Sequence, residues 1–241
     1  MLDNLLNQKE YGPEAKAMTS EFFVNVYSYM FIALGISGTI AYMCGTKEFF
    51  IEYFVNESGT GLSPLFYVVL FAPLALGWAM GKYYSRFSIS SLFLLFGLYS
   101  VLIGLGLSTI FLRYDLGSIF STFVVTAGAF GTMAIVGYTT KTDLTKMGSL
   151  LYMVFFGMLI ATIFNVFFPN GMVSYVVSLL GVVVFTGLTA YHMQNLKYIG
   201  EDPSISHMDK RKLSLIGGLT LYILFINLFL SLLRLMGGSR D

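Results

Sequence analysis

The stretch "LSLIGGLTLYILFINLFLSLLRLM" (213–236) holds one charged side chain, Arg234, which stands near its end. A helix rises about 1.5 Å per residue, so this stretch is long enough to cross roughly 30 Å of bilayer hydrocarbon. Its length and its near lack of charge together predict a transmembrane helix. The chain is therefore expected to be an integral membrane protein.

Similar apolar runs recur along the whole chain. Of its 241 residues 56% are hydrophobic and 11% are charged, and the mean hydropathy is +0.75; soluble domains carry about 25% charged residues. We expect an all-α seven-helix bundle as one membrane domain over residues 22–237, preceded by a cytoplasmic N-terminal segment over 1–21. Long loops are expected only at 45–62 and 193–212. The predicted spans are about 22–44, 63–83, 88–111, 117–138, 148–168, 172–192 and 213–236.

The positions of lysine and arginine predict the orientation, because cytoplasmic loops are enriched in these residues. With the N-terminus in the cytoplasm and the C-terminus outside, ten basic residues lie inside and four lie outside. We expect the protein to lie in a bacterial cytoplasmic membrane. The inside group is Lys9, Lys16, Lys82, Arg86, Lys141, Lys146, Lys197, Lys210, Arg211 and Lys212, and the outside group is Lys47, Arg113, Arg234 and Arg240.

Composition also argues against several function classes. A net charge of +1 disfavours nucleic acid as a partner. No predicted span contains a carboxylate, although carboxylates are the usual mark of proton relays and cation sites inside membranes. The last span has no lysine for a retinal Schiff base, and two histidines are too few for a membrane zinc site. We therefore expect no cofactor and no metal, with the lipid bilayer as the evident partner.

One enzymatic alternative rests on "GISG" (35–38), which matches the G-x-S-G pattern of intramembrane serine proteases. Ser37 would need a histidine base on another helix, and His192 is the candidate. The serine lies in the first span rather than a late one, and small residues are common in these helices as packing sites. We do not expect an enzyme.

Three stretches carry a resemblance to a known family. "YTTKTDLTKMGSLLYM" (138–153), "FTGLTAYHMQNLK" (185–197) and "LTLYILFINLFLSLLRLMG" (219–237) are similar to the signature regions of the Bax-inhibitor/YccA family. The resemblance covers the chain from about residue 20 to its end. It implies a seven-helix bundle with the last helix central, a role in stress responses, calcium leak across membranes and, in bacteria, modulation of a membrane protease.

The resemblance also implies a gate, from which this sequence departs. In calcium-leak members an aspartate on the sixth helix and one on the seventh share a proton, and such a pair titrates as a unit. Here His192 and Leu224 occupy the two positions. We expect His192 and Leu224 to mark the pore, with Lys82, Lys197 and Asn227 as supporting neighbours; the lysines would repel a protonated His192. Asp143, in the loop before the fifth span, is expected to cap that helix.

Two functions therefore stay open. The first is a calcium- or cation-leak activity with altered or absent acid gating, where His192 alone, with an ordinary pKa of about 6.5, supplies any remaining switch. The second is regulation by contact, in which the chain binds a membrane protease or another membrane partner without conducting ions. The loss of both aspartates shifts the balance toward the second function.

Overall fold

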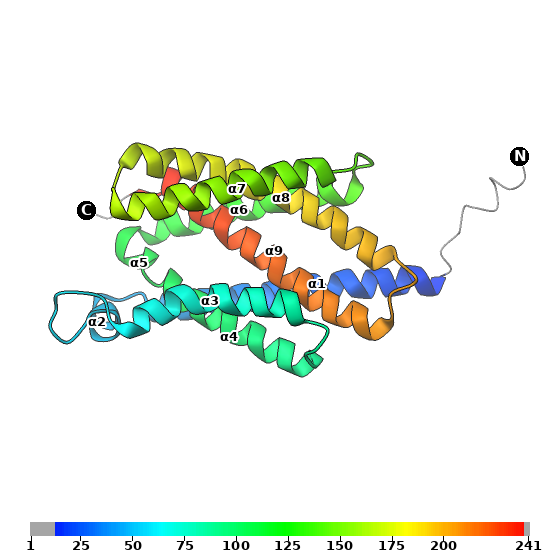
Figure 1. The fold of residues 1–241 in the computed structure, drawn as a ribbon, viewed down its shortest axis with the longest axis horizontal. Helices are drawn as coiled ribbons and strands as arrows, with labels where there is room; N and C mark the ends of the chain where they lie inside the picture. The colour runs from blue at the N-terminus through cyan, green and yellow to red at the C-terminus, as the bar shows by residue number, and fades with distance from the viewer. Residues whose placement is uncertain (1–12, 239–241) are drawn as a thin grey trace, which may run out of the picture.

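The structure is a computed structural model that describes residues 13–238, and these residues form a helical bundle (Figure 1). Seven long helices and three short helical segments follow one another. The long helices are α1 (Pro13–Met43), α3 (Pro64–Tyr83), α4 (Ile89–Leu107), α6 (Leu116–Thr139), α7 (Thr145–Phe167), α8 (Gly171–Glu201) and α9 (His207–Met236). The short ones are α2 (Lys47–Phe49), the π-helix η1 (Phe50–Phe54) and α5 (Ile110–Arg113).

Each long helix is apolar and long enough to cross a membrane, so the prediction of seven spans is confirmed. Several helices begin at a side chain that accepts a hydrogen bond from a backbone N–H of the first turn, which would otherwise lack a partner. These capping residues are Ser63, Ser88, Asp115, Asn170 and Ser206. The helix starts are therefore fixed by local chemistry as well as by the bilayer.

Helix α9 is the centre of the bundle. Figure 1 shows it running obliquely between α3 and α4 on one side and α6, α7 and α8 on the other, and it contacts α1, α3, α4, α6 and α8. In its apolar window 61% of the residues are buried, against at most 33% for any other span. A helix that is apolar on all sides belongs in the interior. The expected all-α bundle with a central last helix is confirmed.

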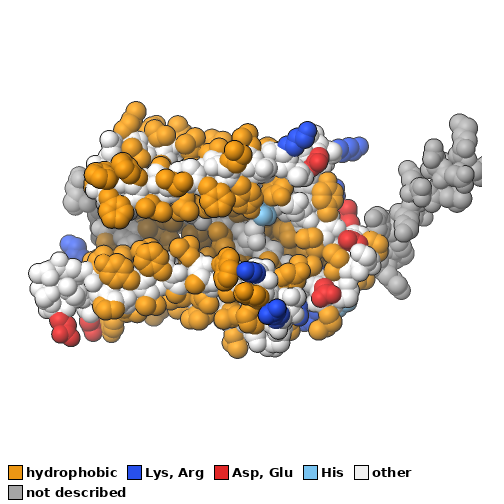
Figure 2. Space-filling view, viewed as in Figure 1, with side chains coloured by type: hydrophobic (Ala, Val, Ile, Leu, Met, Phe, Trp, Pro, Cys, Tyr) orange, Lys and Arg blue, Asp and Glu red, His pale blue; other side chains and the backbone are white. Residues whose placement is uncertain are grey.

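The outer faces of the surrounding helices are also apolar. Large hydrophobic side chains such as Leu74, Phe120 and Ile160 are each about 70% exposed, and such side chains cover most of the surface seen in Figure 2. An exposed apolar surface of this extent is unfavourable in water. It suits a bilayer, whose tails are as apolar as the side chains.

The helices differ from the predicted spans mainly at the side where α8 ends and α9 begins. The loop expected at 193–212 is wrong: α8 continues to Glu201, α9 begins at His207, and only residues 202–206 lie between them. Helix α1 likewise includes residues 13–21 of the segment expected at 1–21, and residues 1–12 lie outside the described residues. Hydropathy reports where a helix leaves the hydrocarbon, whereas the helix itself continues into the polar region.

This extension changes the position of three carboxylates that we expected in loops or tails. Glu21 lies on α1, Glu201 is the last residue of α8, and Asp209 lies in the first turn of α9. All three stand near helix ends on the side opposite to the end of α9. The other expected loop, 45–62, contains α2, η1 and an isolated antiparallel bridge between Val55 and Leu62.

Candidate functional site

His192 lies on α8 and faces α7. Its Nε2 and the hydroxyl of Tyr152 are 2.7 Å apart, within hydrogen-bonding distance. The ring of Tyr191 stands 5.1 Å from the imidazole, edge to face. His192 therefore has a specific neutral partner on the neighbouring helix.

His192, Leu224 and Asn227 line one cavity of about 760 Å³ that runs along α9. Leu224 is almost fully buried, and the side-chain amide of Asn227 donates a hydrogen bond to the Ile223 carbonyl at 2.8 Å within the same helix. Three of the five residues expected at the gate are thus brought together by one turn of α9, which carries Leu224 and Asn227, and the adjoining turn of α8. Their roles in a gate stay predictions.

The polar groups of this cavity are few, and the described residues that line it include no carboxylate. Apart from the group around His192, the charged side chains are Arg113, at the end of α5, and Arg234, near the end of α9. The remaining lining is mainly aliphatic and aromatic side chains of α3, α4, α7, α8 and α9. The cavity is therefore apolar along its length and positively charged at one end.

Lys82 and Lys197 lie elsewhere. The Lys82 ammonium stands 4.7 Å from the centre of the Trp78 ring, while Lys197 Nζ donates a hydrogen bond to the Tyr138 carbonyl at 3.0 Å. Neither lysine lines the cavity with His192. Each lysine contacts an aromatic residue outside the cavity, and the repulsion of a protonated His192 by these lysines stays a prediction.

Ser37 and His192 do not form a catalytic pair. The Ser37 hydroxyl donates to the Leu34 carbonyl within α1, and Ser37 is absent from the described lining of the cavity that holds His192. Within residues 13–238, no three histidine, cysteine or acidic side chains are grouped as metal ligands would be. The described arrangement contains no recognisable nucleophile–base pair of the kind that G-x-S-G suggested.

Gln194 is a functional candidate that we did not predict. Its Oε1 accepts a hydrogen bond from the Leu144 N–H at 2.9 Å, and its Nε2 donates to the Thr142 carbonyl at 2.8 Å. The side chain is only 2% exposed. It therefore joins two of the stretches that carry the family resemblance, 138–153 and 185–197. Gln194 stands two residues after His192 in a stretch that carries the family resemblance, so the sequence marked its position. Only the fold shows which groups it contacts.

Asp143 lies in the loop that Gln194 holds. Its Oδ1 accepts hydrogen bonds from the N–H and the hydroxyl of Thr145, the first residue of α7. Asp143 therefore contacts the first residue of α7, but it is not the N-cap that we expected, because Leu144 holds that position and makes no side-chain capping bond. The Thr145 hydroxyl and then its N–H hold the pKa of the Asp143 carboxyl below its ordinary value.

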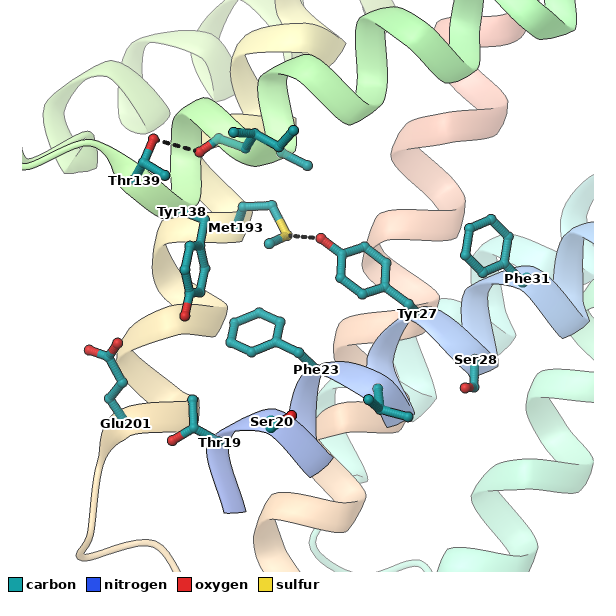
Figure 3. A pocket seen from close by; sticks show the side chains of 13 residues that line it. Thr19, Ser20, Phe23, Tyr27, Ser28, Phe31, Tyr138, Thr139, Met193 and Glu201 are labelled. Atoms are coloured by element: carbon teal, nitrogen blue, oxygen red, sulfur yellow. Dashed lines mark hydrogen bonds between the residues drawn. The ribbon is translucent and has the colours of Figure 1, made fainter. Parts of the chain in front are cut away.

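A second cavity, of about 890 Å³, lies between α1, α6 and α8 (Figure 3). Phe23, Tyr27 and Phe31 of α1 line it together with Tyr138 of α6, whose ring lies edge to face against that of Phe23 at 5.2 Å. The Tyr27 hydroxyl lies 3.6 Å from the Met193 sulfur. Polar groups, among them Thr19, Ser20 and Glu201, collect at one end, so this cavity is amphipathic along the direction of the helices.

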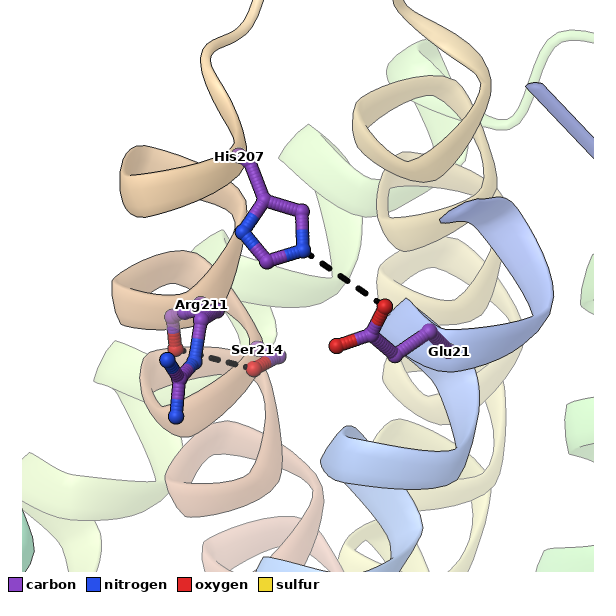
Figure 4. Close-up of polar contacts among 4 residues, drawn as sticks. All are labelled: Glu21, His207, Arg211 and Ser214. Atoms are coloured by element: carbon purple, nitrogen blue, oxygen red, sulfur yellow. Dashed lines mark hydrogen bonds and ion pairs between the residues drawn. The ribbon is translucent and has the colours of Figure 1, made fainter. Parts of the chain in front are cut away.

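A polar cluster joins α1, α8 and α9 near that same end. Lys210 is 6% exposed, and its Nζ donates to the Gly200 carbonyl at 2.7 Å, an oxygen that also accepts from the Thr19 hydroxyl. Beside it, His207 Nε2 of α9 and a Glu21 oxygen of α1 lie 3.5 Å apart (Figure 4). These contacts fix the turn between α8 and α9 against the start of α1.

Comparison with known proteins gives a consistent result. The sequence model of the family described as Bax1-I, Inhibitor of apoptosis-promoting Bax1, matches residues 19–241. The chain is 38% identical to the "Inner membrane protein YbhL" of Escherichia coli K12, over 94% of this chain and 95% of that protein. It is 39% identical to an uncharacterized protein of Borreliella burgdorferi (92% and 94%) and 35% identical to the uncharacterized protein RP147 of Rickettsia prowazekii (91% and 90%).

Proposed function

The chain belongs to the Bax-inhibitor family, and on that premise we propose that it is an inner-membrane protein with an altered gate. The cavity along α9 takes the place of the gated cation path that the family resemblance implies. Calcium or another cation passes through it slowly, without the acid gating of an aspartate pair. Its N-terminus lies in the cytoplasm and its C-terminus outside.

The observation that carries this proposal is the lining of the cavity. His192 and Leu224 stand where the resemblance implies two aspartates, and no carboxylate lines the cavity among the described residues. A carboxylate pair can share a proton and so respond to acid as a unit. A leucine cannot titrate, so any response to pH must come from His192 with its partner Tyr152.

Electrostatics supports a low calcium flux. Calcium prefers oxygen ligands, and carboxylates are the strongest that a protein offers. Here an entering cation would instead meet Arg113 and Arg234, which raise the energy of a positive charge at that end. The apolar stretch around Leu224 adds a constriction of the kind that can close by excluding water.

The test is calcium flux from proteoliposomes between pH 5 and pH 8. Wild type should show a small flux without strong acid inhibition, and His192→Ala should remove any pH dependence that remains. The double variant His192→Asp with Leu224→Asp should gain a larger flux that acid suppresses. A wild-type flux as large and as acid-sensitive as that of the double variant would contradict the proposal.

A second candidate function is regulation by contact with a membrane partner, such as a membrane protease. The cavity between α1, α6 and α8 favours it, because its apolar wall and polar end would suit a helix that enters from the bilayer. A photoreactive residue at Phe31, which is 63% exposed beside this cavity, should then capture the protease in cells. A photoreactive residue placed instead at Ile160, which is 69% exposed on α7, should not capture the protease. Capture at Phe31 without ion flux from the purified protein would favour this function over a leak.

A further inference from the structure

The cavity along α9 is a groove that opens sideways. Helix α3 packs on α4 and helix α7 packs on α8, so α3 and α7 flank a hollow whose floor is α9 (Figures 1 and 2). Its rim includes Leu70 and Leu74 of α3 and Leu159 of α7, which are 52%, 69% and 45% exposed. In a membrane these side chains face hydrocarbon, and the groove is therefore accessible to lipid tails.

Among the described residues that line the positive end of this groove there is no carboxylate. Arg113 and Arg234 are exposed, and neither forms an ion pair with any described residue; within 13–238 the ion pair present joins His207 and Glu21 at the other end. The nearest acidic neighbour in sequence, Asp115, uses its carboxylate to accept bonds from the N–H and hydroxyl of Ser118. Neither guanidinium group is paired with a described carboxylate, and both side chains remain exposed, although Arg113 also lies 5.9 Å from the centre of the Tyr114 ring.

We propose that this groove binds an anionic phospholipid of the leaflet at which α9 ends. One acyl chain lies on α9 between α3 and α7, and the phosphate is bound by Arg113 and Arg234. Guanidinium groups suit phosphate, since they donate two parallel hydrogen bonds to it. The volume of about 760 Å³ lies within the range typical of small-molecule sites.

The length of the groove agrees with this occupant. Its floor extends from Thr220 to Arg234, which is about 21 Å of helix at 1.5 Å per residue. One leaflet contributes about 15 Å of hydrocarbon. The acyl chain of a lipid whose phosphate is bound at Arg234 therefore has room to reach past the middle of the bilayer, toward His192. The proposal does not require ion conduction, because lipid binding is measured directly.

The test is native mass spectrometry of the full-length protein with phosphatidylglycerol or phosphatidylcholine added in equal amounts. Wild type should prefer phosphatidylglycerol, and Arg113→Gln with Arg234→Gln should lower that preference by about fivefold per arginine. The control Lys47→Gln with Lys141→Gln removes the same charge from exposed positions outside the groove and should leave the preference unchanged. Equal binding of both lipids by wild type, or an unchanged preference in the arginine variant, would overturn the proposal.

A second measurement locates the acyl chain of the bound lipid. Phosphatidylglycerol with a photoreactive group on its acyl chain should label peptides that contain Leu70–Leu74 of α3 and Phe155–Leu159 of α7. Addition of inorganic phosphate in excess should not prevent the labelling, because the chain contributes to binding as well as the phosphate. Labelling confined to the outer faces of other helices, or its loss on adding phosphate, would show that no lipid occupies the groove.

Discussion

Gln194 of α8 accepts a hydrogen bond from the backbone N–H of Leu144 at 2.9 Å and so holds the loop that precedes α7. The same side-chain amide also donates to the Thr142 carbonyl. The two bonds bring a side chain from the sixth span to a loop fifty residues earlier in the chain. They connect the helix that carries His192 with the start of the helix that carries Tyr152.

Replacement of Gln194 by leucine should release this loop. Both hydrogen bonds are lost and two backbone groups are left without their partner, which costs roughly 1–3 kcal/mol per buried group. We expect a lower thermal midpoint in detergent and faster tryptic cleavage after Lys141. Asn195→Leu is the matched control, since Asn195 makes no side-chain hydrogen bond with the described residues. Equal cleavage of the two variants would show that Gln194 does not hold the loop.

Lys210→Met should loosen the turn between α8 and α9. The buried ammonium donates to the Gly200 carbonyl in the last turn of α8, where carbonyl groups lack partners within the helix. A hydrogen bond to a charged group contributes about 1.5–3 kcal/mol. The free energy of unfolding in a detergent titration should fall by that amount. Arg211→Met, at an exposed position one residue later, should change it little.

Gly137→Ala should separate α6 from α8. A Cβ at Gly137 would overlap the backbone carbonyl of Ala190, and a backbone group cannot rotate away as a side chain can. Overpacking of this kind costs about 1–3 kcal/mol. Gly128→Ala on the same helix has open space around its Cβ and serves as the control. Thermal unfolding of both variants checks the prediction, and equal midpoints would contradict it.

The hydrogen bonds of Asp143 predict that the stability of the fold falls in acid. The Thr145 hydroxyl and N–H lower the pKa of its carboxyl in the folded state, so the unfolded state binds a proton more readily. The ionised Asp143 carboxyl therefore adds to the free energy of unfolding above the unfolded pKa of about 3.9. This stabilisation is lost as pH falls through the lower pKa of the folded state. Asp143→Ala should therefore lower the thermal midpoint at pH 7 but not at the acid limit. A constant difference between wild type and variant across this range would exclude the mechanism.

Two residues of the candidate site could be predicted from the sequence, but the side chains that they contact could not. His192 and Leu224 were placed by motif, and the structure puts both on one cavity. The side chain of Lys197 reaches back to the Tyr138 carbonyl, and its expected repulsion of a protonated His192 stays a prediction. Tyr152 and Gln194, which supply the actual contacts, stood in quoted motifs without any sign of what they would bind.

The sequence alone determined that the chain crosses a membrane seven times. Hydrocarbon offers no hydrogen bonds to a backbone, so each crossing must be a helix of about twenty apolar residues, and such runs can be counted. Only the tertiary structure decided which side of each helix faces α9, which faces lipid and which lines a cavity. Lipid tails and a packed interior are equally apolar, so hydrophobicity does not distinguish the sides of a helix. The groove beside α9, with two arginines at its end, exists because the packing of α3 on α4 and of α7 on α8 leaves it open.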